Sequence, residues 1–204
     1  MENPINPINV EEYLRMEQTS SEKHEYFDGE IYVMSGGTMA HSVIASNIGL
    51  ALKAQLKGSG CRVHISDLKV MVDATNSFYY PDVFVECGDY DKDSLYTKTP
   101  VAIFEVLSKS TATIDRREKL FAYKRLESLK AYFIVQQSRK RITAYLRDEK
   151  NNWCSSEFVN SGELLVANCS NRSIRIALDE IYEDCDLDDN PDLQVREEVT
   201  EYAW

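Results

Sequence analysis

The sequence lacks the features that mark membrane, secreted and zinc-binding proteins. No apolar run approaches the roughly 20 residues that a membrane-spanning helix needs, and the first residues do not join a basic segment to an apolar one. We therefore expect a cytoplasmic protein with no membrane partner. The five cysteines are odd in number and scattered, with no CxxC pair. This argues against a zinc knuckle and a disulfide framework, and favours buried or idle thiols.

The sequence also lacks an internal repeat, and it has no helix-turn-helix or zinc-finger pattern for reading bases. What is present suits a soluble globular protein, since 43% of the 204 residues are hydrophobic and 28% are charged. A chain of this length forms one domain with a sizeable core. We expect this domain over residues 1–182 and an acidic tail over residues 183–204.

Most of the negative charge lies near the C-terminal end. The net charge is −11, but residues 179–204 alone hold eleven acidic residues and one basic residue. Residues 109–147 show the opposite balance, with eleven basic and three acidic residues. The net charge of the whole chain is therefore a poor guide to its partners.

Helical and strand patterns alternate along the chain. Asn9 and Glu12 suit a capping box at the start of a short helix, and Asp28-Gly29 is the turn of a hairpin. Longer helices are expected at residues 41–56 and 115–126. The expected strands lie at residues 61–65, 67–72, 80–87, 101–107, 132–135, 141–146, 153–159, 164–169 and 174–178. Those between residues 132 and 169 are expected to form an antiparallel meander.

Two apolar strands each carry a carboxylate that a core strand does not need. Asp82 lies in the segment at residues 80–87 and Glu105 in that at residues 101–107. A buried carboxylate is costly unless it is paired or binds a metal. If the two strands are neighbours, Asp82 and Glu105 lie side by side and can bind Mg²⁺ or Mn²⁺. Such a metal polarises a phosphoryl oxygen and activates water.

The helix at residues 115–126 offers a basic candidate. The residues that fall on one stripe at 100° per residue are Asp115, Lys119, Ala122, Tyr123 and Leu126. If this stripe faces the sheet, Lys119 lies beside the carboxylates, where it can position water or stabilise developing charge. The alternative is a solvated ion pair between Asp115 and Lys119, and the helix alone favours that alternative.

In their order, these residues resemble a nuclease signature. Pro81-Asp82 followed by Glu105-x-Leu107 resembles the pattern of the PD-(D/E)XK nuclease superfamily. More closely, the chain is similar to the Uma family of restriction endonucleases, over about residues 10–178. The matching segments are residues 26–31, His41, residues 80–83, residues 105–108 with Ser110-Thr111, Asp115, Lys119 and the strand at Tyr132.

The resemblance implies an α/β (α+β) fold of the restriction-endonuclease type, with a mixed sheet flanked by helices and extra antiparallel strands in the C-terminal half. It also implies a Mg²⁺-dependent enzyme that hydrolyses DNA, with Asp82 and Glu105 as metal ligands and catalytic residues. Leu107 stands where the signature has lysine. Because related nucleases can supply that lysine from the following helix, the resemblance favours Lys119 as the third catalytic residue.

Five other polar residues are further candidates for this site, with a structural alternative for most of them. Glu25 can join the metal site, or it pairs at the surface with Lys23 or His24. His41 lines the site, or it makes a polar contact at the start of its helix. The others are Asp67, at the rim or capping a turn, Asp115, and Gln136, which reaches the site or ends its strand.

The basic region is interpreted as a surface for DNA phosphates, with a solvated face that pairs with the acidic tail as the alternative. Its candidate residues are Arg116, Arg117, Lys124, Arg125, Arg139, Lys140 and Arg141. A homodimer is expected, because two cuts on two strands suit a two-fold assembly. Two hypotheses compete with the nuclease: a non-catalytic nucleic-acid-binding or partner-binding module of the same fold, and a structural oligomer that exchanges its tails.

Overall fold

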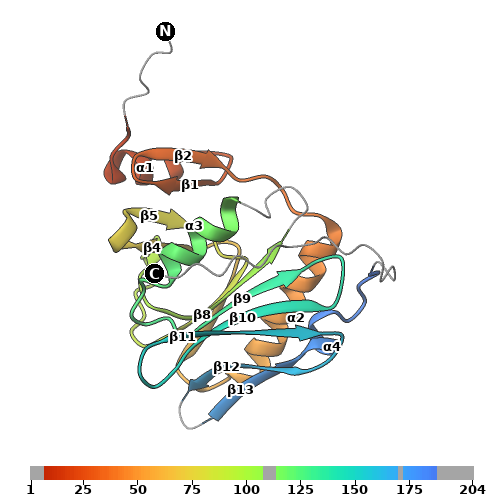
Figure 1. Ribbon diagram of the computed structural model, residues 1–204. Helices are drawn as coiled ribbons and strands as arrows, with labels where there is room; N and C mark the ends of the chain where they lie inside the picture. Colours follow the sequence, from red (N-terminus) through yellow and green to blue (C-terminus); the bar gives the residue numbers. More distant parts are fainter. Residues whose placement is uncertain (1–6, 108–113, 170–171, 188–204) are drawn as a thin grey trace, which may run out of the picture.

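The structure is a computed structural model that describes residues 7–107, 114–169 and 172–187 (Figure 1). Its helices are α1 (Val10–Glu17), α2 (Met39–Gln55), the 3₁₀ turn η1 (Asp73–Thr75), α3 (Ile114–Tyr123) and α4 (Leu178–Ile181). Its strands are β1 (His24–Phe27), β2 (Glu30–Val33), β3 (Cys61–Ile65), β4 (Lys69–Val72), β5 (Ser77–Tyr79), β6 (Val83–Cys87), β7 (Tyr96–Thr97), β8 (Pro100–Leu107), β9 (Ala131–Gln136), β10 (Arg141–Arg147), β11 (Trp153–Val159), β12 (Glu163–Cys169) and β13 (Arg172–Ala177).

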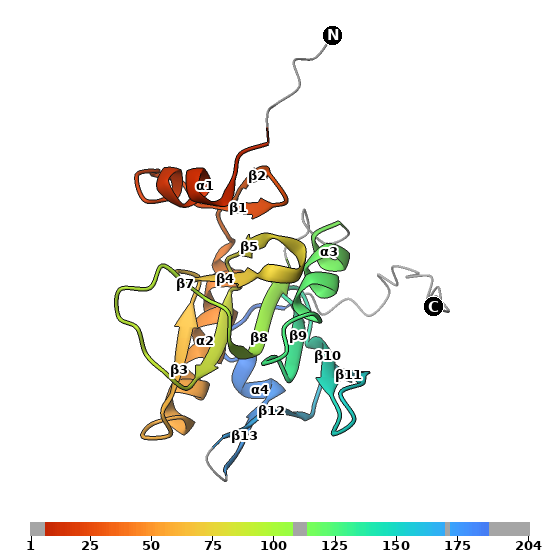
Figure 2. The same cartoon turned by 90° about the vertical axis from the view of Figure 1, so that its left-hand side faces the viewer.

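A mixed six-stranded sheet forms the centre of the fold, in the order β11-β10-β9-β8-β6-β3. Strands β8 and β9 are parallel and are joined through α3, whereas the other neighbours in this sheet are antiparallel. A second sheet, β2-β1-β5-β4-β7, lies beside α3, and β12 pairs with β13 alone (Figures 1 and 2). This is the mixed α/β fold that the resemblance implies.

Alternation along the central strands creates two hydrophobic cores, one on each face of the sheet. Val83 and Phe104 face the core that α2, α4, β12 and β13 complete. Phe84 and Ile103 face the other core, which α3, β4 and β5 complete. The side chains of Asp82, one residue before Val83, and of Glu105, one residue after Phe104, therefore belong to the α3 side of the sheet.

The N-terminal part of the chain contributes β1 and β2 to one end of the second sheet, with α1 beside them (Figures 1 and 2). Asn9 and Glu12 make the predicted capping box, with Asn9 Oδ1 accepting from the Glu12 amide at 3.0 Å. Tyr13 of α1 packs on Tyr26 of β1 and Phe78 of β5 in a small separate core. This packing fixes β1, and with it Glu25, against the strand that leads to Asp82.

Two expectations about strands are wrong in detail. The segment at residues 80–87 is not one strand, because Tyr80 and Pro81 separate β5 of one sheet from β6 of the other. The meander ends at β11, since β12 pairs with β13 in its own two-stranded sheet. Both errors concern which strand pairs with which, a property that hydrophobic alternation does not encode.

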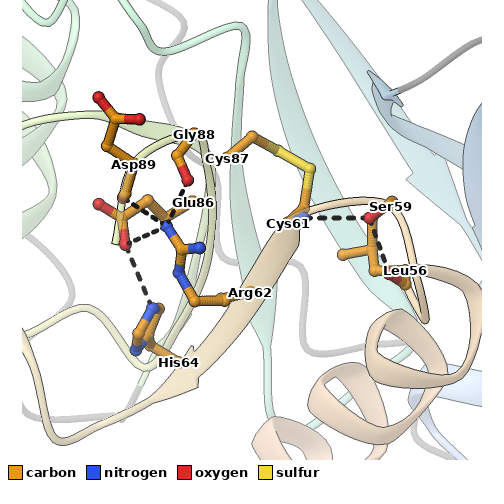
Figure 3. The surroundings of a disulfide bond; sticks show 9 residues. All are labelled: Leu56, Ser59, Cys61, Arg62, His64, Glu86, Cys87, Gly88 and Asp89. Atoms are coloured by element: carbon orange, nitrogen blue, oxygen red, sulfur yellow. Dashed lines mark hydrogen bonds and ion pairs between the residues drawn. A yellow bond between two sulfur atoms is a disulfide. The ribbon is translucent and has the colours of Figure 1, made fainter. Parts of the chain in front are cut away.

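The expectation of unpaired thiols is also wrong. Cys61 of β3 and Cys87 of β6 are directly opposite in the antiparallel register and form a disulfide, with Cα atoms 4.1 Å apart (Figure 3). Arg62, beside the disulfide, donates to the carbonyl oxygens of Gly88 and Asp89 at 3.0 and 2.7 Å. The edge strand β3 is thus held to β6 both covalently and by the arginine.

No helix among the described residues is long and apolar enough to cross a bilayer. The tail predicted for residues 183–204 falls mostly outside the described residues. Within the part of it that is described, Cys185 and Leu187 pack against the larger core.

The disulfide predicts a loss of stability on reduction. Cys61 and Cys87 are 26 residues apart, and closing a loop of that length stabilises the fold by about 3 kcal/mol. In a chain of this size, we expect a reductant to lower Tm by about 6–12 °C. Cys61→Ser should lower Tm similarly and make it insensitive to the reductant, whereas the exposed Cys154→Ser should behave as wild type. Equal Tm values with and without reductant would contradict the pairing.

Candidate active site

The two carboxylates predicted as metal ligands lie at one end of the neighbouring strands β6 and β8, Asp82 just before β6 and Glu105 within β8. Val83 of β6 is paired with Phe104 of β8 in the antiparallel register. Asp82, which precedes Val83, and Glu105, which follows Phe104, are therefore at the same end of the two strands. Glu105 is only 7% exposed, so its carboxylate requires partners within the protein.

Asp82 is held in place by the backbone of β8 and by α2. Its Oδ2 accepts from the Val106 amide at 2.7 Å, and His41 Nε2 lies 3.2 Å from the same oxygen. The hydrogen bond to Asp82 raises the pKa of His41, although burial opposes the rise. His41 occupies the first turn of α2, where its amide donates to the Thr38 hydroxyl at 3.2 Å. His41 was expected either to line the site or to make a polar contact at the start of its helix. Its ring lies at the candidate site, against Asp82.

Lys119 extends from α3 toward the carboxylates. Its Nζ lies 2.8 Å from Glu25 Oε1 and 3.9 Å from Glu105 Oε1, and Lys119 is only 7% exposed. The Tyr79 ring lies beneath the ammonium group, 5.7 Å from centroid to Nζ. The stripe that contains Lys119 therefore faces the sheet, and the solvated alternative for this lysine is excluded. The Asp115 side chain lies outside the described residues.

Three hydrogen bonds fix the carboxylates, and no sequence pattern assigned a role to the groups that donate them. Glu105 Oε1 accepts from the Tyr123 hydroxyl at 3.0 Å. Burial and the Glu105 charge raise the pKa of Tyr123 well above its ordinary value, so its hydroxyl remains a donor. Glu25 Oε1 accepts from the Tyr80 amide at 3.1 Å. The third contact is the Val106 amide on Asp82. Tyr123 was detectable, since it is four residues after Lys119 and lies on the same stripe.

Two of the other candidates have partners outside this group. Asp67 pairs with Lys23 at 2.9 Å, and its side chain is 90% exposed. Gln136 lies opposite Leu107 in the parallel register, and its Oε1 accepts from Arg139 Nε at 2.5 Å. Leu107 packs against the core on the α3 side, which leaves Lys119 as the lysine beside Glu105.

The basic region divides into two parts. Arg117 is exposed on α3, while Lys124 and Arg125 follow that helix and lie over aromatic rings. At the β9–β10 turn, Lys140 pairs with Asp179 at 2.7 Å, and Arg141 pairs with both oxygens of Glu157 at 2.8 and 3.0 Å. The Arg116 side chain lies outside the described residues. The charges of Lys140 and Arg141 are therefore paired within the fold, although their partners belong to α4 and β11 and not to the acidic tail that the alternative named.

The donor set at this end of the sheet suits a hard cation with few protein ligands. Within the described ranges there is no group of three or more His, Cys, Asp or Glu side chains arranged to hold a metal. Mg²⁺ is commonly held by one or two carboxylates, with water and substrate oxygens in its remaining positions. Asp82 and Glu105 meet that requirement, and they do not meet that of a structural zinc site, which needs four protein ligands.

Comparison with known proteins agrees with this geometry. Residues 10–178 match the Uma2 family, described as "Putative restriction endonuclease". The chain belongs to this family.

The relatives cover most of the chain. The "Uncharacterized protein slr1290" of Synechocystis sp. is 34% identical over 180 residues, which are 88% of this chain and 93% of that protein. The "Uncharacterized protein sll1609" of the same organism is 26% identical over 155 residues, 74% of this chain and 88% of that protein. A crystal structure described as a "putative nuclease belonging to DUF820" from Anabaena variabilis has the same fold, with a TM-score of 0.70, 14% identity, and coverage of 86% of this chain and 98% of that one.

The buried ion pair between Lys119 and Glu25 should contribute more to the free energy of unfolding than the exposed pair between Lys23 and Asp67. Glu25→Ala removes a partner from a lysine side chain that is 9% exposed, and we expect a loss of about 3 kcal/mol in the free energy of unfolding. Asp67→Ala removes the partner of Lys23, whose side chain is 44% exposed, and should cost less than about 1 kcal/mol. Urea denaturation measures both. Equal losses would show that the Lys119 pair is not a buried anchor.

Proposed function

We propose that this protein is a Mg²⁺- or Mn²⁺-dependent endonuclease that hydrolyses phosphodiester bonds of DNA. The observation that carries the proposal is the position of Lys119 Nζ, 3.9 Å from Glu105 Oε1. A lysine from α3 thereby stands beside the carboxylate, although Leu107 occupies the usual lysine position of the signature. Membership of the Uma2 family supports the same reaction class.

In this proposal, Asp82 and Glu105 hold the metal. When bound, the metal polarises a phosphoryl oxygen and lowers the pKa of a coordinated water. The protein keeps both carboxylates in position beforehand, since the Val106 amide donates to Asp82 and the Tyr123 hydroxyl donates to Glu105. Donors that are fixed before substrate arrives do not have to reorganise during the reaction.

Lys119 supplies the positive charge that phosphodiester hydrolysis requires. As the attacking oxygen approaches phosphorus, negative charge accumulates on the phosphoryl oxygens, and a nearby ammonium group stabilises it. Glu25 keeps Lys119 on the α3 side of the sheet through their 2.8 Å contact. In this scheme Glu25 is a positioning residue.

The competing function is a nucleic-acid-binding or partner-binding module that has kept the nuclease fold without catalysis. Leu107 at the usual lysine position favours it, and so does the shorter distance of Lys119 to Glu25 than to Glu105. The two functions differ in their requirement for metal and in cleavage.

A DNA-cleavage assay tests the proposed endonuclease activity. We expect the purified protein to cut DNA with Mg²⁺ or Mn²⁺ and not with EDTA. Asp82→Ala and Lys119→Met should each lower the rate at least about a hundredfold, and Asp67→Ala should leave it within about twofold. Absence of cleavage by the folded wild type, or equal cleavage by Asp82→Ala, would favour the binding module.

We also propose that the enzyme acts as a homodimer, because a two-fold assembly presents one site to each strand of a duplex. Light scattering should give twice the 23.4 kDa of the chain. A monomer mass at the concentration used for cleavage would contradict this assembly.

A further inference from the structure

The end of α3, β10 and the first residues of β11 together carry one exposed aromatic ring, Phe121, and two half-buried rings, Tyr145 and Trp153. Each ring is paired with a cation. Arg125 lies over the Phe121 ring at 4.5 Å, Lys124 lies over the Tyr145 ring at 4.9 Å, and Arg147 lies over the Trp153 ring at 4.7 Å. We call Phe121, Arg125, Lys124, Tyr145, Arg147 and Trp153 the aromatic platform.

Contacts between the elements make this platform continuous. Arg147 of β10 donates to the carbonyl oxygens of Lys124 and Glu127 at 2.9 and 3.0 Å, so it joins the end of α3 to the sheet. Trp153 lies opposite Arg147 in the antiparallel register. Tyr145 and Trp153 each pack partly against the core on the α3 side. The rings are thus anchored from beneath and held in fixed positions.

Packing within the fold does not explain the exposed position of the Phe121 ring. Phe121 is 51% exposed, and it lies two residues after the buried Lys119, which at 100° per residue places it on the opposite side of α3. Arg117 lies one helical turn before it and Arg125 one turn after it, and both are exposed. An aromatic ring between two exposed guanidinium groups suits a ligand that is anionic along its length and has flat apolar groups.

We propose that the aromatic platform binds a single-stranded segment of nucleic acid, with a base stacked on Phe121 and phosphates beside Arg117, Lys124 and Arg125. Only unpaired bases expose their faces for stacking, whereas a duplex offers phosphates but hides those faces. The substrate of the adjacent site is then DNA with unpaired bases next to the bond that is cut. This last statement rests on the proposed nuclease function, while binding to the platform does not.

The cations of the β9–β10 turn provide an internal contrast. Lys140 and Arg141 belong to the same basic stretch of sequence, but Asp179 and Glu157 pair with them. The platform therefore receives the strand, and the turn contributes little to binding.

Binding measured in EDTA tests the platform without cleavage. Fluorescence anisotropy should show that a labelled oligothymidylate binds more tightly than a blunt duplex of equal length. Phe121→Ala should weaken single-strand binding about tenfold, the size of one lost base–aromatic stack, and leave duplex binding unchanged. Val159→Ala, which truncates an apolar side chain that is likewise 51% exposed on β11, is the matched control. Arg125→Ala should weaken binding to both, and Lys140→Ala to neither.

Intrinsic fluorescence gives a second readout. The chain has two tryptophans, so Trp204→Phe leaves Trp153 as the sole tryptophan, and oligothymidylate should quench its emission. Tighter binding of duplex, no binding of either probe, or equal effects of Phe121→Ala and Val159→Ala would each overturn the proposal. If one of these three outcomes is found and the protein still cuts DNA with Mg²⁺, the platform is wrong and the nuclease function stands.

Discussion

The interaction on which the candidate site depends is the buried ion pair between Lys119 and Glu25. The two residues come from α3 and from the N-terminal hairpin, elements that lie in different layers of the fold. A buried ammonium group needs a carboxylate partner, and the 2.8 Å contact with Glu25 provides one while leaving Lys119 within 3.9 Å of Glu105. The hairpin therefore has a definite role, since it sets the position of the lysine that the strand of Glu105 does not supply.

This arrangement explains how the site accommodates Leu107. With leucine in the strand, the α3 side of the sheet gains an apolar contact instead of a charge. Helix α3, which connects β8 to β9, supplies the positive charge instead, through Lys119. The same helix carries Phe121 on its outer side. One short helix therefore supplies both the candidate catalytic lysine and a ring of the aromatic platform. The platform and the site are thereby linked through the backbone of α3.

Strand alternation and the cost of a buried carboxylate are local properties, and they singled out Asp82 and Glu105 in the sequence. The mixed fold followed only from the family resemblance, and the adjacency of the two strands was a condition that the structure supplies. The inward direction of Lys119 followed from helical periodicity together with the family resemblance. The disulfide between Cys61 and Cys87 was missed, since it depends on the register of two strands 26 residues apart. The division of the basic region was missed for a similar reason: the partners of Lys140 and Arg141 come from other elements.

Binding of the metal itself tests the central claim most directly, that Asp82 and Glu105 form one site for a divalent cation. Titration calorimetry with Mn²⁺ on the folded chain should detect one ion per chain, and Asp82→Ala should abolish this binding while Asp67→Ala retains it. Lys119→Met should still bind the ion, since the role proposed for the lysine is to stabilise charge on the phosphate and not to bind the metal. Absence of binding to the wild type, or unchanged binding by Asp82→Ala, would contradict the account.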